Sequence, residues 1–177
     1  MTLMATQGPV AVPLDRAGAH DLAACLLGEV GTRLRHVERA AQVAAHLGVL
    51  FDHDEAELLV AAATLHDIGY APPVARTGFH PLDGGLYLRE HCYDDRLAAL
   101  VAHHSLAFLT ADHHGVLDLE DLFPREESLL VDALVYADMH SAPDGRLIPA
   151  RDRLDDIGAR HTHGAVQRRA ALLRASM

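Results

Sequence analysis

The run LLVAAATLHDIGY, residues 58–70, constrains the fold of this chain more than any other stretch. Its leucines and alanines are strong helix formers, and almost every residue in it is apolar. Gly69 is a helix-ending residue and stops the predicted helix. The adjacent His66 and Asp67 interrupt the apolar pattern at the end of this helix, where patterning places neither side chain. The pair therefore calls for a functional explanation within a helical fold.

Helical periodicity continues along almost the whole chain. Apolar residues recur at steps of three and four, and hardly any segment shows the apolar and polar alternation of a β-strand. Loops are expected around Pro72, Gly78, Gly115 and Pro143. We therefore predict an all-α protein, a single compact helical bundle. The predicted helices cover residues 14–28, 32–47, 54–68, 81–91, 94–103, 105–114, 125–140, 149–160 and 163–175.

Length, charge and composition exclude several classes of protein. The 177 residues fit one domain by size, and half of them are hydrophobic, which is typical of a globular chain with a packed core. The net charge of −10 argues against an extended nucleic-acid surface or an anionic membrane surface but leaves small ligands open. No apolar run is long enough to cross a bilayer, and the N-terminus lacks the pattern of a secretion signal. The two cysteines have no metal-like spacing, so we expect reduced thiols and a cytoplasmic protein.

Four polar residues stand beside core-facing positions on separate predicted helices. They are His36 in RLRHVERAAQVAAHLG, the His66-Asp67 pair, and Asp138 in DALVYADMHS. A helical bundle can direct such side chains inward to one point, which is how metal sites are built in bundle cores. Imidazole and carboxylate ligands together suit Fe, Mn, Co, Ni or Zn, and binding removes the penalty of a buried unpaired carboxylate. We therefore predict that these four residues bind a divalent metal.

The order His, His-Asp, Asp on helices resembles the HD superfamily of metal-dependent phosphohydrolases. The resemblance covers residues 31–140, and the contexts of the His-Asp pair and of the last aspartate are both similar to the usual setting in that family. It implies that the whole chain, 1–177, forms one HD-type helical domain, with an N-terminal helix and C-terminal helices packed on the core. The compact single domain is similar to symmetrical dinucleoside tetraphosphate hydrolases. The family's four metal-ligand positions correspond to His36, His66, Asp67 and Asp138.

Further histidines lie between these positions, as in family members that hold two metals. This chain has His80 in TGFHPLDGGLYLRE and the pair His103 and His104 in LVAHHSLAF. By resemblance, His80 and one or both of the pair would complete a second site, with Asp67 as the bridge. Adjacent helical residues point about 100° apart, so a cleft recruits one of the pair more easily than both, and we favour His104 slightly. In the alternative, a single metal is bound and the extra histidines contact substrate phosphate.

The predicted site suits hydrolysis of a phosphate ester or anhydride. One or two divalent metals would polarise a phosphoryl oxygen and lower the pKa of a bound water, which Asp67 would hold and orient. Arg33, near His36, and Arg76, in the loop after the His-Asp pair, are candidate contacts for the phosphate. The expected substrate is a small phosphate compound, and a nucleotide is the favoured class.

Two sequence features separate this chain from particular relatives. Tyr70 follows HDIG where many relatives carry a lysine, so the contribution of that charge is missing. No Gly-Tyr-Pro signature follows His104, which argues against the cyclic-dinucleotide phosphodiesterases named for it. The same ligands could also serve a di-iron oxygenase of the HD fold, or a regulatory module that senses a nucleotide without turnover. The intact set of candidate ligands favours catalysis.

Overall fold

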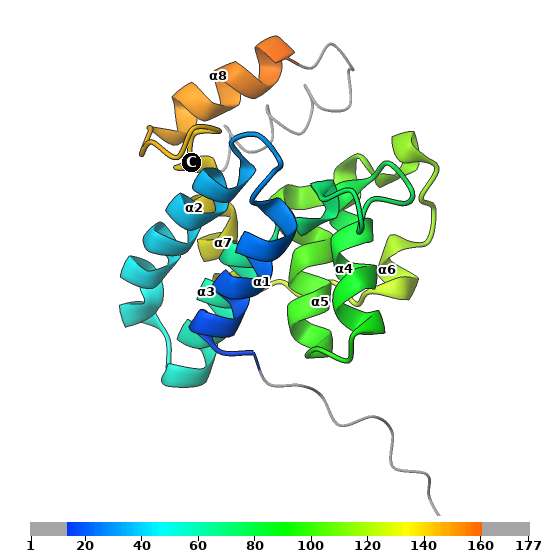
Figure 1. Cartoon of the computed structure of the whole chain (residues 1–177), viewed down its shortest axis with the longest axis horizontal. Helices are drawn as coiled ribbons and strands as arrows, with labels where there is room; N and C mark the ends of the chain where they lie inside the picture. Colours follow the sequence, from blue (N-terminus) through cyan, green and yellow to red (C-terminus); the bar gives the residue numbers. More distant parts are fainter. Residues whose placement is uncertain (1–13, 161–177) are drawn as a thin grey trace, which may run out of the picture.

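A computed structural model describes residues 14–160 of the chain, with side chains described as far as Asp155. This part holds eight α-helices and no sheet, and the prediction of an all-α fold is confirmed. None of the described helices is long and apolar enough to cross a bilayer. In the view of Figure 1, α2, α3 and α7 lie on one side of α1, and α4, α5 and α6 lie on the other. The α-helices are α1 (Arg16–Leu27), α2 (Arg33–Leu47), α3 (His53–Leu65), α4 (His80–Glu90), α5 (Asp95–His103), α6 (Leu119–Leu122), α7 (Leu129–Met139) and α8 (Ala150–Arg160). The 3-10 helices are η1 (Gly48–Leu50), η2 (Ile68–Tyr70), η3 (His104–Leu109) and η4 (Ala111–His114).

Helix α3 lies at the centre of the bundle. Asp52 caps its N-terminus, where the carboxylate accepts a hydrogen bond from the backbone N–H of Glu55 at 2.9 Å. Every side chain from Leu59 to Leu65 is buried, because α3 packs against α1, α2, α5 and α7. A helix that is apolar on all its faces is stable only when it is surrounded in this way. The burial therefore explains why the apolar run of the sequence has no polar face.

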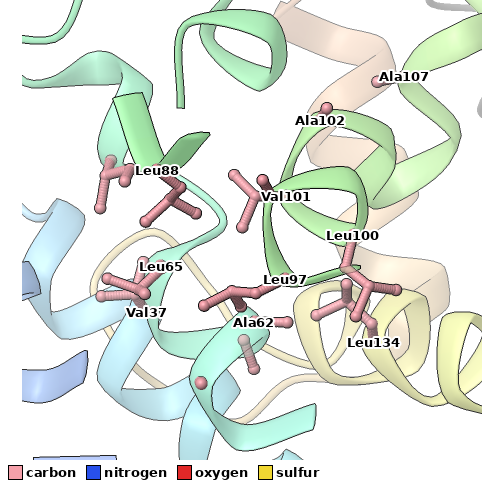
Figure 2. Packing of buried hydrophobic residues seen from close by; sticks show 14 of the residues in the cluster. Val37, Ala62, Leu65, Leu88, Leu97, Leu100, Val101, Ala102, Ala107 and Leu134 are labelled. Atoms are coloured by element: carbon pink, nitrogen blue, oxygen red, sulfur yellow. The ribbon is translucent and has the colours of Figure 1, made fainter. Parts of the chain in front are cut away.

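Side chains from several helices meet beside α3 in one apolar core. Figure 2 shows Val37 of α2, Leu65 of α3, Leu97 and Val101 of α5, and Leu134 of α7 in this cluster. All five are at most 2% exposed. Full burial of one such side chain contributes roughly 1.5–3 kcal/mol to folding. The core therefore fixes the helices whose ends carry the polar residues described below.

Helices α4 and α5 pack at a distance that only glycine permits. A Cβ on Gly84 would lie 2.9 Å from Cγ1 of Val101, and a Cβ on Gly85 would lie 2.9 Å from Cβ of Ala102. Real side-chain carbons do not approach so closely, so a larger residue would force the two helices apart. The glycine pair in the sequence is thus a packing contact, and it brings the start of α4 near the end of α5.

The loop between η2 and α4 folds the start of α4 back onto the end of α3. A Cβ on Gly69 would lie 1.9 Å from the backbone oxygen of His80, so this approach also requires glycine. The buried carboxylate of Asp83 fixes the loop by accepting hydrogen bonds from the backbone N–H groups of Arg76 and Thr77, each at 3.0 Å. The same carboxylate also accepts a hydrogen bond from the hydroxyl of Thr77 at 2.8 Å. These contacts place the first residue of α4 beside the end of α3.

The structure corrects the helix predicted over residues 105–114. This segment forms the two 3-10 helices η3 and η4. The cause is the backbone of Ser105 and Leu106, whose φ angles of 52° and 57° are left-handed and incompatible with an α-helix. The apolar residues of the segment are spaced as in a helix because some of them, such as Ala107 and Ala111, are buried, although the backbone is irregular.

The segment predicted as a helix over 125–140 is helical only within α7. The hydroxyl of Ser128 accepts a hydrogen bond from the backbone N–H of Val131 at 3.3 Å and caps the helix at that point. The short helix α6, which precedes it, has too few residues to show a periodic pattern. The helix predicted over 163–175 lies outside the described residues.

Candidate metal centre

Six of the predicted site residues come together in the interior of the bundle, and we call them the His-Asp centre. All are buried except His80, whose side chain is 22% exposed. Most of them stand at the ends of helices. They are His36 in α2, His66 and Asp67 after α3, His80 at the start of α4, His104 after α5, and Asp138 near the end of α7.

Two histidines of the centre face each other through their Nε2 atoms. Nε2 of His36 lies 3.2 Å from Nε2 of His66. On the other side of each ring, Nδ1 of His36 lies 3.3 Å from the carbonyl oxygen of Ala142, and Nδ1 of His66 lies 2.9 Å from that of Ala63. A carbonyl oxygen only accepts, so these contacts assign the proton to Nδ1 and leave a lone pair on each Nε2. Two lone pairs this close repel each other unless a cation lies between them.

Two buried carboxylates stand next to this histidine pair. Oδ2 of Asp67 lies 3.7 Å from Nε2 of both His36 and His66. Oδ1 of Asp138 lies 3.1 Å from Nε2 of His36 and 3.8 Å from Nε2 of His66. The short contact falls outside hydrogen-bond geometry, and Oδ1 of Asp138 has no hydrogen-bond donor among the described residues. His36, His66 and Asp67 thus form a group that could hold a divalent metal, and the carboxylate of Asp138 adjoins it.

The second oxygen of Asp67 faces a second pair of histidines. Oδ1 of Asp67 lies 3.4 Å from Nε2 of His80 and 3.8 Å from Nε2 of His104. The two Nε2 atoms are 3.2 Å apart. Nδ1 of His104 contacts the carbonyl oxygen of Val101 at 2.7 Å, so Nε2 of His104 also presents a lone pair. Asp67 thus lies between two groups, each of which could hold an ion.

Both carboxylates of the centre stay ionised in spite of their burial. Burial alone would raise the pKa of Asp67, but the interactions of its carboxylate with His66, His80 and Arg33 outweigh burial and hold that pKa well below its usual value. Burial likewise acts to raise the pKa of Asp138, but its interactions with His36 and His66 outweigh burial and hold that pKa well below its usual value. An ionised carboxylate is the form that binds a metal.

The histidines of the two groups differ in their affinity for a proton. Burial, followed by the neighbouring rings of His66 and His80, holds the pKa of His104 well below its usual value. Burial acts to lower the pKa of His36 as well, but the contact with Asp138 and its charge outweigh burial and raise it. A metal bound by His36, His66 and Asp67 would therefore compete with a proton on His36. His104 is already in the neutral form that binds a metal.

Arg33 lies at the partly exposed side of the centre. Its Nη1 donates a hydrogen bond to Oδ2 of Asp67 at 2.6 Å, and its guanidinium carbon lies 3.9 Å from the centroid of the Tyr70 ring. Tyr70 in turn stacks on His80, with ring centroids 3.9 Å apart and an interplanar angle of 20°. The structure thus holds a positive charge over the ring of the tyrosine that follows HDIG in the sequence.

The structure does not bring His103 to the centre. Its Nε2 donates a hydrogen bond to the carbonyl oxygen of Phe123 at 2.7 Å. The next residue, His104, faces the other histidines, because successive residues at a helix end point about 100° apart. The geometry therefore separates the two neighbours that the sequence left as alternatives.

Arg76 is not brought to the centre either. Its guanidinium forms two hydrogen bonds with the carboxylate of Glu90, at 2.6 and 2.7 Å, on the exposed surface. Glu90 is the last residue of α4 and His80 the first, so the two are about 15 Å apart along the helix axis. The hydrogen bonds from the loop backbone to Asp83 hold Arg76 in this position.

Two buried polar residues beside Asp138 are absent from the sequence prediction. The hydroxyl of Ser105 donates a hydrogen bond to Oδ2 of Asp138, and Nη2 of Arg153 in α8 lies 3.9 Å from Oδ1. Ser105 and Arg153 are 1% and 6% exposed. No local signal identifies them, since serine and arginine are common on helix surfaces and only the fold buries these two.

Comparison with known proteins supports the resemblance seen in the sequence. A family model described as the HD domain matches residues 33–153, which is more than half of the chain. The match starts at the first residue of α2 and ends at Arg153, so it spans every residue of the His-Asp centre. No curated protein and no solved structure matches the chain.

Proposed function

The chain belongs to the HD domain family, and we propose that it is a metal-dependent phosphohydrolase that acts on a small phosphate compound, with a nucleotide as the favoured class. The observation that carries the proposal is the position of Asp67. One carboxylate oxygen faces His36 and His66, and the other faces His80 and His104. A buried carboxylate between two pairs of histidines suits a pair of divalent ions a few ångströms apart.

A metal held by these residues would supply Lewis acidity, which lowers the pKa of a coordinated water and polarises a phosphoryl oxygen. The nitrogen and oxygen ligands suit Fe, Mn, Co, Ni or Zn. Backbone carbonyls behind three of the rings hold them in the tautomer that turns the Nε2 lone pair toward the centre. The ligands in this proposal are His36, His66, Asp67 and Asp138 for one ion, and Asp67, His80 and His104 for the second.

Arg33 and Asp67 would orient the reacting groups. The side chain of Arg33 is 27% exposed, so it can donate one N–H to a phosphate oxygen while another remains on Asp67. The ionised carboxylate of Asp67 can accept a hydrogen bond from a water and hold it for attack. Arg76 has no part in this proposal, because its guanidinium is engaged with Glu90 at the far end of α4.

Phosphate release from a panel of nucleotides tests the proposal. The full-length protein, reconstituted with Mn, Fe, Co, Ni or Zn, is incubated with nucleoside phosphates, cyclic nucleotides and dinucleoside polyphosphates. We expect metal-dependent hydrolysis of at least one compound. Asp67→Asn should reduce it by more than the roughly 100-fold that loss of an outer-shell partner can cost. Asp112→Asn, a change in the exposed helix η4, is the matched control and should keep full activity.

Failure to hydrolyse any of these compounds with any metal would contradict the proposal. Oxygen consumption by the iron-loaded protein would then support a di-iron oxygenase of the same fold. Nucleotide binding without turnover would support a sensing module. Each alternative uses the same His-Asp centre, so the reaction and not the fold decides among them.

A further inference from the structure

A cavity lies next to the His-Asp centre, between the end of α5, η3 and the start of α7, and we call it the α5–α7 cavity. Its volume is about 480 Å³, which is within the range of sites for small organic ligands. Most of its wall is apolar. The apolar residues of the wall include Leu100, Leu106, Phe108, Val131, Leu134 and Val135.

The cavity adjoins the centre through His104. This residue forms part of the cavity wall, and its Nε2 lies 3.2 Å from Nε2 of His80 and 3.8 Å from Oδ1 of Asp67. On α7, Leu134 of the wall stands four residues before Asp138, so both side chains lie on the same face of the helix. The cavity and the centre are therefore neighbours, and His104 lies at their common boundary.

The charges of the cavity wall disfavour phosphate inside it. Glu126, Glu127 and Asp132 contribute carboxylates, and among the residues that the structure describes Arg125 is the only arginine or lysine of the wall. Arg125 is already paired, at 3.0 Å with Glu120 and at 2.9 Å with Glu127. Glu126 is paired with Arg96 at 2.7 Å, and the remaining balance of charge is still negative. The wall therefore favours a neutral or cationic group with N–H donors over an anion.

We propose that the α5–α7 cavity holds the nucleobase of the substrate while the phosphate lies at the His-Asp centre. This inference rests on the proposed function and specifies its substrate class. A base is flat and has apolar faces that suit the leucine and phenylalanine side chains of the wall. It also carries an amine or ring N–H that can donate to a carboxylate of the wall. The phosphate and the base of the substrate would thus bind to two different regions of the protein. A metal-loaded centre favours a negative group, and the cavity favours a neutral or cationic one.

Binding of nucleosides, which have no phosphate, tests the cavity without requiring hydrolysis. Adenosine, cytidine, guanosine and uridine are titrated at millimolar concentration into the full-length protein in a calorimeter. We expect at least one to bind, and Val131→Phe, which fills the cavity, to weaken its binding at least about tenfold. Val49→Phe is the same change at a residue that is 86% exposed in η1, and it should leave binding unchanged. Binding by none of the nucleosides, or equal binding to Val131→Phe and native protein, would overturn the proposal.

Kinetics distinguish failure of the cavity from failure of the proposed function. In an active enzyme, Val131→Phe should raise KM for a nucleotide about tenfold or more and leave hydrolysis of tripolyphosphate, which has no base, unchanged. Nucleotide hydrolysis with an unaltered KM in this variant would overturn the cavity and keep the phosphohydrolase. Nucleoside binding that is sensitive to Val131→Phe, without any hydrolysis, would keep the cavity and overturn the phosphohydrolase.

Discussion

Backbone carbonyl oxygens orient three of the histidines in the His-Asp centre. Each carbonyl contacts Nδ1 of one ring and so turns the Nε2 lone pair toward the interior. The rings therefore have the required tautomer as a consequence of folding, before any ligand binds. The pairs are His36 with Ala142 at 3.3 Å, His66 with Ala63 at 2.9 Å, and His104 with Val101 at 2.7 Å.

The first prediction at this scale concerns His66. His66→Ala should lower the metal content of the reconstituted protein by about one ion per chain. The reason is that the ion proposed to bind His36, His66, Asp67 and Asp138 loses one of these four ligands. Elemental analysis of the purified protein gives the stoichiometry. His53→Ala, a change of an exposed histidine at the start of α3, should bind as much metal as the native protein. Equal and negligible metal in native and His66→Ala protein would show that the centre is not a metal site.

The second prediction concerns Ser105, whose hydroxyl donates to Asp138 from a left-handed backbone. Ser105→Gly and Ser105→Ala both remove the hydroxyl, and each should weaken metal binding about 10- to 100-fold. Only glycine removes the strain of the positive φ, so Ser105→Gly should be more stable than Ser105→Ala by about 1 kcal/mol. Competition with a chelating dye measures the affinity, and thermal unfolding measures the stability. Unchanged affinity in both variants would show that the hydroxyl does not position Asp138.

Among the secondary-structure elements, helix ends contribute most of the centre. His66 and Asp67 follow α3, His80 opens α4, and His104 follows α5. Ligands at helix ends move with any shift of the helix relative to its neighbours. The spacing between helices therefore controls the distance between ligands, and the glycine contact of α4 with α5 sets the distance between His80 and His104.

The third prediction tests this control through Gly85. A Cβ there would lie 2.9 Å from Cβ of Ala102 and 3.0 Å from the backbone oxygen of Ala98. Gly85→Ala should destabilise the protein by about 1–3 kcal/mol and separate α4 from α5, so that metal content falls from two ions toward one. Gly48→Ala is the control, since its nearest contact would be an ordinary 3.4 Å. Full metal content in Gly85→Ala would show that the spacing between α4 and α5 does not control metal binding by His80 and His104.

On the scale of the whole molecule, the centre joins elements that are distant in the sequence. Its six residues come from α2, the segment after α3, α4, the segment after α5, and α7, and Arg153 brings α8 against Asp138. A metal in this position would act as an internal cross-link. Its removal would leave buried lone pairs and carboxylates facing one another, which opposes folding.

The fourth prediction follows from this arrangement. Treatment with EDTA should lower the unfolding temperature, because a ligand present at about 1,000 times its Kd stabilises the folded state by about 4 kcal/mol. Thermal unfolding with and without excess Mn measures the difference. Asp67→Asn, which lacks the bridging carboxylate, should respond much less to the chelator. An unfolding temperature that does not change with EDTA in the native protein would contradict a structural effect of metal.

The sequence alone determined the class of fold and its central helix. Helical periodicity and an apolar run are local properties, so the all-α prediction and the HD resemblance were both confirmed. The same local pattern marked His66 and Asp67, because polar residues in an apolar helix are visible without knowledge of the fold. That they and the other four residues of the centre bind metal stays a prediction, although the structure does bring the six together.

Only the tertiary structure decided which neighbouring candidates face the centre. His103 and His104 differ by the rotation of a helix end, and Arg33 and Arg76 differ by their carboxylate partners, Asp67 and Glu90. The direction of a side chain at a helix end and the partner of an arginine cannot be predicted from the sequence alone. Both depend on contacts between residues that are far apart in the sequence. The break in the helix predicted over 105–114 has the same cause. The left-handed turn there is held by burial and by a hydrogen bond to Asp138 on α7, and such long-range contacts override local helix propensity.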